Sequence, residues 1–151
     1  MRKILVVDDE TSFLNLLRHA LEAQGYMVLT AENGKTAVNW VREVPLDLAI
    51  VDLGLPDISG MEVCRTIKEN PRTRHTKVII LTGNNTNEAR IESNLNARAE
   101  LFLNKPIQIA DLRSAVSGLL ERSEKEKMLL RASFSRFAAP GRATGTGKEE
   151  F

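Results

Sequence analysis

Residues 4–9 read ILVVDD, four apolar residues followed directly by two aspartates. Two later stretches repeat this arrangement, with a charged residue at or just beyond the end of an apolar run: LAIVD at 48–52 and LFLNK at 101–105. Each run has the length and composition of a short strand buried on both faces of a sheet. If the runs are parallel strands of one sheet, their carboxyl ends meet at one edge, where open α/β sheets bind ligands. We therefore expect three carboxylates and one ammonium group to converge there.

Apolar residues at helical spacing separate these strands, so that strands and helices alternate five times along the chain. This alternation predicts an α/β fold, a doubly wound five-stranded parallel sheet with right-handed crossovers and helices on both faces. Residues 84–98 have few apolar anchors, and we expect a helix there. The expected strands are 4–7, 26–30, 46–51, 78–81 and 101–103, and the expected helices contain Phe13–Leu21, Ala37–Val41, Met61–Ile67 and Ile109–Leu120.

Composition excludes several classes of protein. A chain of 151 residues is long enough for one domain with an extension and needs no metal or disulfide to fold. With 21 basic and 20 acidic residues it offers no charge excess for a direct nucleic-acid contact. No apolar run approaches the roughly 20 residues of a membrane span, and the single cysteine fits a reduced, cytoplasmic protein.

The composition changes after Arg122, so we expect three segments: a domain at 1–122, a helical linker at 123–139 and a disordered tail at 140–151, truncated or tagged. A partial apolar stripe would continue the last helix past Arg122 and consists of Met128, Leu129, Leu130, Phe134 and Phe137. Such a stripe predicts a homodimer through the C-terminal helix, whereas the charge run at 122–127 interrupts the stripe and argues against it.

Clustered carboxylates repel one another unless a cation neutralises them, and Mg²⁺ is the hard cation that one or two carboxylates commonly hold. A carboxylate can also attack phosphorus and form an aspartyl-phosphate. Phosphoryl transfer requires mainly positioning and charge neutralisation. Besides Asp8, Asp9 and Asp52, the chain offers Lys105 and Thr82 at further strand ends.

The ordered set of motifs resembles the receiver domain of two-component response regulators. The resemblance runs from Arg2 to about Arg122 and is carried by the acidic start, the LPDISGME stretch at 55–62, Thr82-Gly83 and FLNKP at 102–106. The resemblance to this family, and not the residues alone, implies the flavodoxin-like strand order 2-1-3-4-5. Residues 130–140 are also similar, over a short stretch, to the lead-in of nucleotide cyclase outputs.

The resemblance implies a role for each matching position. Asp52 would accept the phosphoryl group, and Lys105 and Thr82 would bind its oxygens. Asp8 and Asp9, together with Asp52 and the backbone carbonyl of Gly54, would hold Mg²⁺. Thr82 and Phe102 would form the switch, and the Lys105–Pro106 peptide bond would be cis. Three positions depart from the family pattern: Gly54, Asn94 and Arg98.

These observations predict a receiver that takes a phosphoryl group from a histidine kinase or phosphotransfer protein and controls a partner or fused output that is unknown. It would catalyse its own phosphorylation and dephosphorylation without being an enzyme in the usual sense. The alternative is a receiver-like scaffold that binds a partner without phosphorylation. A third interpretation is a small hydrolase with an aspartate nucleophile, for which no insertion is long enough to form a cap.

Overall fold

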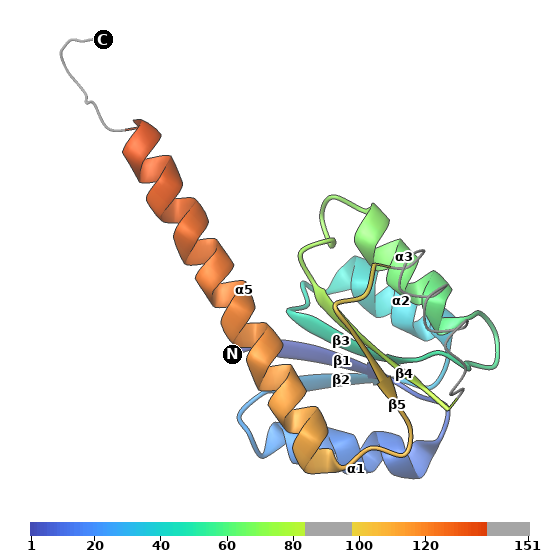
Figure 1. Cartoon of the computed structure of the whole chain (residues 1–151). Helices are drawn as coiled ribbons and strands as arrows, with labels where there is room; N and C mark the ends of the chain where they lie inside the picture. The colour runs from blue at the N-terminus through green and yellow to red at the C-terminus, as the bar shows by residue number, and fades with distance from the viewer. Residues whose placement is uncertain (84–97, 139–151) are drawn as a thin grey trace, which may run out of the picture. The chain divides into compact units, whose positions relative to one another are not determined.

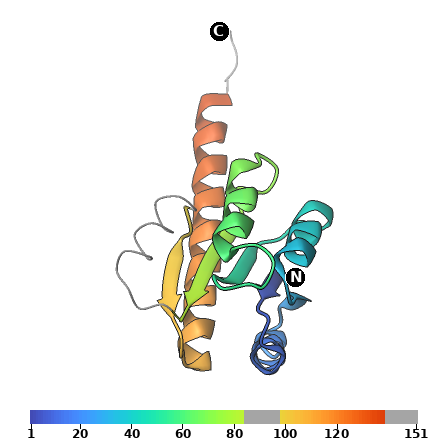
Figure 2. The same cartoon turned by 90° about the vertical axis from the view of Figure 1, so that its right-hand side faces the viewer.

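The computed structural model of the protein describes residues 1–83 and 98–138, with 135–138 described by their backbone alone. Five parallel strands form one sheet in the order β2-β1-β3-β4-β5. The predicted fold class and strand order are confirmed. The strands are β1 (Lys3–Val7), β2 (Met27–Ala31), β3 (Leu48–Asp52), β4 (Lys77–Thr82) and β5 (Leu101–Asn104). The arrowheads of β4 and β5 point the same way in Figure 2, as parallel neighbours must.

Helices cover both faces of this sheet, with α1 on one face and both α2 and α3 on the other (Figure 1). Alternation along the strands explains the two layers: Leu5 and Val7 pack in the cluster beneath α2 and α3, whereas Ile4 and Val6 point to the opposite face. All four side chains are buried, as expected of a parallel sheet. The described helices are α1 (Thr11–Glu22), α2 (Gly34–Glu43), α3 (Gly60–Glu69) and α5 (Ile109–Ala138).

The start of α2 is joined to the loop after β3. Asn33 caps the helix through its side chain, which accepts a hydrogen bond of 2.8 Å from the Thr36 amide, as its sequence position predicts. The carboxylate of Asp57 accepts two more, from the amides of Gly34 at 2.7 Å and Lys35 at 2.9 Å. A Cβ at Gly34 would lie 2.2 Å from the Ile58 side chain, which would have to move to admit a larger residue. The loop that follows Asp52 is thereby tied to a neighbouring helix.

Most strand boundaries differ from those predicted by one residue, and the start of β3 differs by two. β3 begins at Leu48, not at residue 46, because the Leu46 carbonyl accepts a hydrogen bond of 2.8 Å from the Thr76 hydroxyl instead of pairing in the sheet. β3 also includes Asp52, which was expected just beyond the strand. The helix predicted over 84–98 and the tail predicted over 140–151 lie outside the described residues, apart from Arg98.

The last helix continues unbroken through the charge run, since α5 spans 30 residues from Ile109 to Ala138. The predicted continuation past Arg122 is confirmed. The chain divides into two compact units, Met1–Ser117 and Gly118–Phe151. The boundary predicted at 122/123 stays a prediction. None of the described helices combines the length and the apolar character that a membrane span requires.

Arg98 adopts a backbone φ of +59°, in the left-handed region that strains a residue with a side chain. Arg98→Gly should therefore raise the free energy of unfolding by about 1 kcal/mol, measured by urea denaturation. Arg98→Ala is the matched control, because it removes the charge and keeps the strain. An equal gain in both variants would show that the charge of Arg98, and not its backbone conformation, lowers the free energy of unfolding.

Candidate functional site

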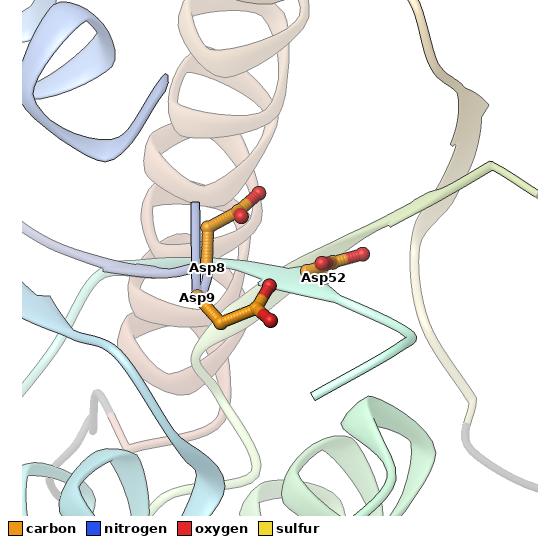
Figure 3. Close-up of side chains that lie close together, drawn as sticks. All are labelled: Asp8, Asp9 and Asp52. Carbon is orange, nitrogen blue, oxygen red and sulfur yellow. The ribbon is translucent and has the colours of Figure 1, made fainter. Parts of the chain in front are cut away.

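The register of the central strands brings the three aspartates together. Val7 of β1 pairs with Val51 of β3, so Asp8 and Asp52, the next residues, emerge at the same edge of the sheet. One carboxylate oxygen from each of Asp8, Asp9 and Asp52 lies within 4.8 Å of the others. Figure 3 shows Asp8 and Asp9 leaving the end of one strand beside Asp52 at the end of the next. Asp8 and Asp52 are buried, whereas Asp9 is exposed to solvent.

Backbone hydrogen bonds hold these carboxylates in place. Asp8 Oδ1 accepts a bond of 2.8 Å from the amide of Glu10, and the Asp8 amide donates to the Ala31 carbonyl of β2 at 3.1 Å. Asp52 Oδ1 accepts a longer bond of 3.4 Å from the amide of Gly54. Asp8 is therefore fixed more firmly than Asp52, which keeps its second oxygen, Oδ2, directed toward Lys105.

Lys105 brings a positive charge from the end of β5 across to the acids of β1 and β3. Its Nζ atom lies 2.7 Å from Asp8 Oδ2 and 3.6 Å from Asp52 Oδ2. The Lys105 amide donates to the Thr82 carbonyl at 2.7 Å, and the Lys105–Pro106 bond is cis, as the resemblance implies. Burial alone would lower the pKa of Lys105, but the hydrogen bond to Asp8 and the charge of Asp52 outweigh it and raise that pKa. The lysine therefore stays charged.

The pKa of Asp52 shifts in the opposite direction to that of a carboxylate in a simple ion pair. Its burial, reinforced by the negative charge of Asp8, raises the pKa of Asp52 even though Lys105 and the Gly54 amide act to lower it. The ionised form of Asp52 is thus destabilised in the metal-free protein. Because hard oxygen ligands suit a divalent cation, a cation at this cluster would relieve the destabilisation, and Mg²⁺ fits the donor set.

The other predicted site residues are placed by their strands. Thr82 ends β4, one residue beyond Leu81, which pairs with Asp52, so it lies at the same edge of the sheet and is buried. Phe102 of β5 is partly buried and packs against the core beneath α2 and α3. Gly54 is exposed, and a Cβ built on it would meet nothing within 4 Å. The structure thus joins the three aspartates and Lys105 by short distances, with Thr82 at the same edge of the sheet, whereas Phe102 packs against the core.

Phe13 is a residue of this site that the sequence pattern did not identify. Lys105 Nζ lies over its ring, 5.0 Å from the centroid, which is within the range of a cation–π interaction. A hollow of about 310 Å³ opens beside this pair, lined by Glu10, Phe13, Lys105, Pro106 and Ile107. Phe13 fits the apolar stripe of α1, which assigns it to the core. Its place one helical turn after Asp9 was the signal that could have identified it.

Comparison with known proteins agrees with this geometry. The profile of the response regulator receiver domain matches residues 4–117. The chain belongs to this family of receiver domains. The phosphate regulon transcriptional regulatory protein PhoB of Rhizobium meliloti is 36% identical over 124 residues, which cover 82% of this chain and 54% of that protein. A probable cyclic di-GMP phosphodiesterase of Vibrio cholerae is 36% identical over 128 residues, 84% of this chain and 28% of that protein.

Solved receiver structures agree as well. A CheY-like receiver domain protein from Methanospirillum hungatei has a TM-score of 0.76 and 31% identity, and the match covers 83% of this chain and 98% of that one. The response regulator TrrA of Thermotoga maritima, solved in complex with Mg²⁺ and beryllofluoride, has a TM-score of 0.69 and 34% identity over 79% of this chain and 99% of that one. This receiver is therefore a signalling domain, and it spans about half or less of the two curated relatives described above.

Two aspartates of this receiver should respond oppositely to the same substitution. Asp52→Asn should raise the midpoint of thermal unfolding of the metal-free protein at pH 7, because it removes a destabilised charge. The gain should disappear as the pH falls through the raised pKa of Asp52 and below the ordinary value of 3.8, where the wild-type carboxyl is neutral.

Asp57→Asn is the matched control for this prediction. Hydrogen bonds from the amides of Gly34 and Lys35 lower the pKa of Asp57 to about 2, so its charged form stabilises the fold above pH 3.8 and that stability is lost as the pH falls toward 2. Asp57→Asn should therefore lower the midpoint at pH 7. Shifts of the same sign in the two variants would contradict the assigned environments.

Proposed function

We propose that Asp52 is the phosphoacceptor of this receiver and that a histidine kinase or phosphotransfer protein is the donor. The observation that carries the proposal is the arrangement around Asp52: a buried carboxylate, 3.6 Å from the ammonium group of Lys105 and grouped with Asp8 and Asp9. The phosphorylated state would change the conformation of the domain and control a partner or a fused output. That output is not identified, since the chain covers 54% or less of the curated relatives described above.

The proposed reaction is a displacement at phosphorus. An oxygen of Asp52 attacks the phosphoryl group, the P–N bond of the phosphohistidine breaks, and the nitrogen lone pair returns to the donor's imidazole. The product is an acyl phosphate, a mixed anhydride of the Asp52 side chain. Lys105 faces the attacking oxygen and would neutralise charge on the transferred group. To reset the domain, a water attacks the same phosphorus and releases inorganic phosphate and free Asp52.

Mg²⁺ is the proposed cofactor, held by carboxylate oxygens of Asp8, Asp9 and Asp52 and by the backbone carbonyl of Gly54. When bound, it would supply the positive charge that phosphoryl oxygens require. Asp8 already shares one oxygen with Lys105 at 2.7 Å and the other with the Glu10 amide. Asp9, which is exposed, is consequently the carboxylate with the greatest freedom to approach a cation.

Thr82 and Phe102 are the proposed switch. Thr82 ends the strand beside Asp52, and the carbonyl of Thr82 accepts from the Lys105 amide at 2.7 Å, so the two phosphate-binding side chains are coupled through the backbone. A hydroxyl drawn toward the phosphoryl group would move the end of β4, and the half-buried Phe102 on the adjacent strand would follow. The proposed compartment is the cytoplasm, consistent with a sequence that has a single cysteine, Cys64.

Phosphorylation can be tested directly with a small-molecule donor. Acetyl phosphate with Mg²⁺ should add one phosphate mass to the full chain, labile to hydroxylamine, and chelation of the metal should suppress it. Asp52→Ala should abolish the adduct, whereas Asp57→Asn, an aspartate in the following loop outside the acidic cluster, should retain it.

Three results would overturn this assignment. Labelling of Asp52→Ala at the wild-type level would exclude Asp52 as the acceptor. Absence of any adduct, and of Mg²⁺-dependent beryllofluoride binding, would favour a scaffold that is not phosphorylated. Steady turnover of a phosphomonoester would instead favour a hydrolase.

The aspartyl-phosphate should hydrolyse readily because Gly54 places no side chain over the site. Space around the Gly54 Cβ position is open, so larger residues can be introduced there without a clash. Gly54→Met and Gly54→Arg should slow autodephosphorylation, measured by decay of the phosphorylated species after the donor is removed. Gly54→Ala, whose methyl group is too short to cover the site, should decay at nearly the wild-type rate. Unchanged or faster decay in both large variants would refute the role of access.

A further inference from the structure

Lys105 has to hold its charge in one place for the proposed transfer, yet the two acids beside it do not fix that place. Its Nζ atom lies 2.7 Å from Asp8 Oδ2 and 3.6 Å from Asp52 Oδ2, so the closer carboxylate draws it away from the proposed phosphoacceptor. A lysine side chain is also a long, flexible stem with a compact charge at its end. Something other than these carboxylates must limit its motion.

The open side of Lys105 leads away from the acidic cluster. The Lys105 side chain is 22% exposed. It lines a hollow of about 310 Å³ together with Glu10, Phe13, Pro106 and Ile107. Glu10 is exposed, and its carboxylate belongs to none of the groups that hold Lys105 in the site. An ammonium group that moved into the hollow would therefore meet an acid outside the cluster.

The ring of Phe13 lies where it opposes this motion. Lys105 Nζ lies over the ring, 5.0 Å from its centroid, within the range of a cation–π interaction. The ring is carried by α1, which is fixed to the rest of the domain by the buried Leu14 and Leu17. Attraction to a ring face occupies none of the three N–H donors of the ammonium group with a directed hydrogen bond. These donors therefore stay available to carboxylate and phosphoryl oxygens.

We propose that Phe13 is a positioning residue for phosphoryl transfer to Asp52: its ring holds the Lys105 ammonium group at the acidic cluster and away from Glu10. Phe13 acts only through Lys105 and contacts no reacting atom. Because attraction to a ring face is less directional than a hydrogen bond, Nζ can turn from Asp8 toward a phosphoryl oxygen on Asp52 and keep its contact with the ring. This inference rests on the proposed phosphorylation of Asp52.

The rate of labelling by acetyl phosphate measures the contribution of the ring. Phe13→Leu keeps an apolar side chain and removes the ring, so it should slow labelling of the full chain at saturating Mg²⁺ by about fivefold. Phe13→Tyr keeps the ring and should be labelled at close to the wild-type rate. Leu16→Ala is the matched control, because Leu16 is an apolar residue of the same helix that is 56% exposed, and it should leave the rate unchanged. Circular dichroism of each variant confirms that the fold is retained.

The affinity for Mg²⁺ separates positioning from damage to the site. Calorimetry should give Phe13→Leu a Mg²⁺ affinity no weaker than that of wild type, because the three carboxylates are unchanged and a less constrained ammonium group competes less for Asp8. An affinity that falls in step with the labelling rate would show that the substitution disrupts the acidic cluster, and it would overturn the inference.

A second substitution tests where Lys105 goes when the ring is lost. Glu10→Gln removes the charge that would attract the ammonium group into the hollow, while the backbone amide of residue 10 can still donate to Asp8 Oδ1. The gain in labelling rate from Glu10→Gln should therefore be larger in the Phe13→Leu background than in wild type. Equal gains in the two backgrounds would show that Phe13 does not hold Lys105 away from Glu10.

Nuclear magnetic resonance of the metal-free protein tests the contact itself, without phosphorylation. The ring current of Phe13 should shift the ε-methylene protons of Lys105 upfield, and this shift should be lost in Phe13→Leu and retained in Phe13→Tyr. Absence of the shift in wild type would overturn the inference. A wild type that is labelled on Asp52 at the same rate as Phe13→Leu would overturn the inference and leave the proposed function intact. A wild type that is not labelled at all would overturn both.

Discussion

The electrostatic repulsion among the carboxylates of Asp8, Asp9 and Asp52 is the interaction on which the rest of this site depends. The parallel register of β1 and β3 forces two of them to the same sheet edge, where they are buried. Water cannot screen buried charges well, so the raised pKa of Asp52 is the direct consequence. Lys105 offsets part of the cost through its contact of 2.7 Å with Asp8. A cation bound at the cluster would reduce this repulsion further.

Contacts around the cluster keep it from relaxing. The amide of Glu10 holds Asp8, and the Phe13 ring beneath Lys105 limits where the ammonium group can go. Asp57 ties the loop after Asp52 to the start of α2, where Gly34 packs closely against the Ile58 side chain. Positioning of this kind matters because phosphoryl transfer relies on charge placement more than on covalent chemistry by the protein. The hydrogen bond from the Lys105 amide to the Thr82 carbonyl also couples the proposed phosphorylation site to the end of β4.

The exposure of the C-terminal helix changes along its length. Its early turns bury Leu112 and Val116, while its later turns present the same face to solvent. The relatives that match this chain over a quarter to a half of their length carry further sequence beyond the matched part.

The sequence alone determined the elements and their order along the chain: apolar runs set the strands, helical spacing set α1 to α3, and charged residues at strand ends marked Asp8, Asp52 and Lys105. These features are local, because periodicity and strand ends depend on residues that are close together in the sequence. Tertiary structure alone decided the contacts between distant segments. These contacts include the Phe13 ring beneath Lys105 and the hydrogen bond from the Gly34 amide to Asp57 at the start of α2. They also include the hydrogen bond from the Thr76 hydroxyl to the Leu46 carbonyl, before the start of β3. Each contact joins residues that no sequence periodicity relates. The pKa of Asp52 belongs with them, because burial and the charges of Asp8 and Lys105 act on it only when the sheet has formed.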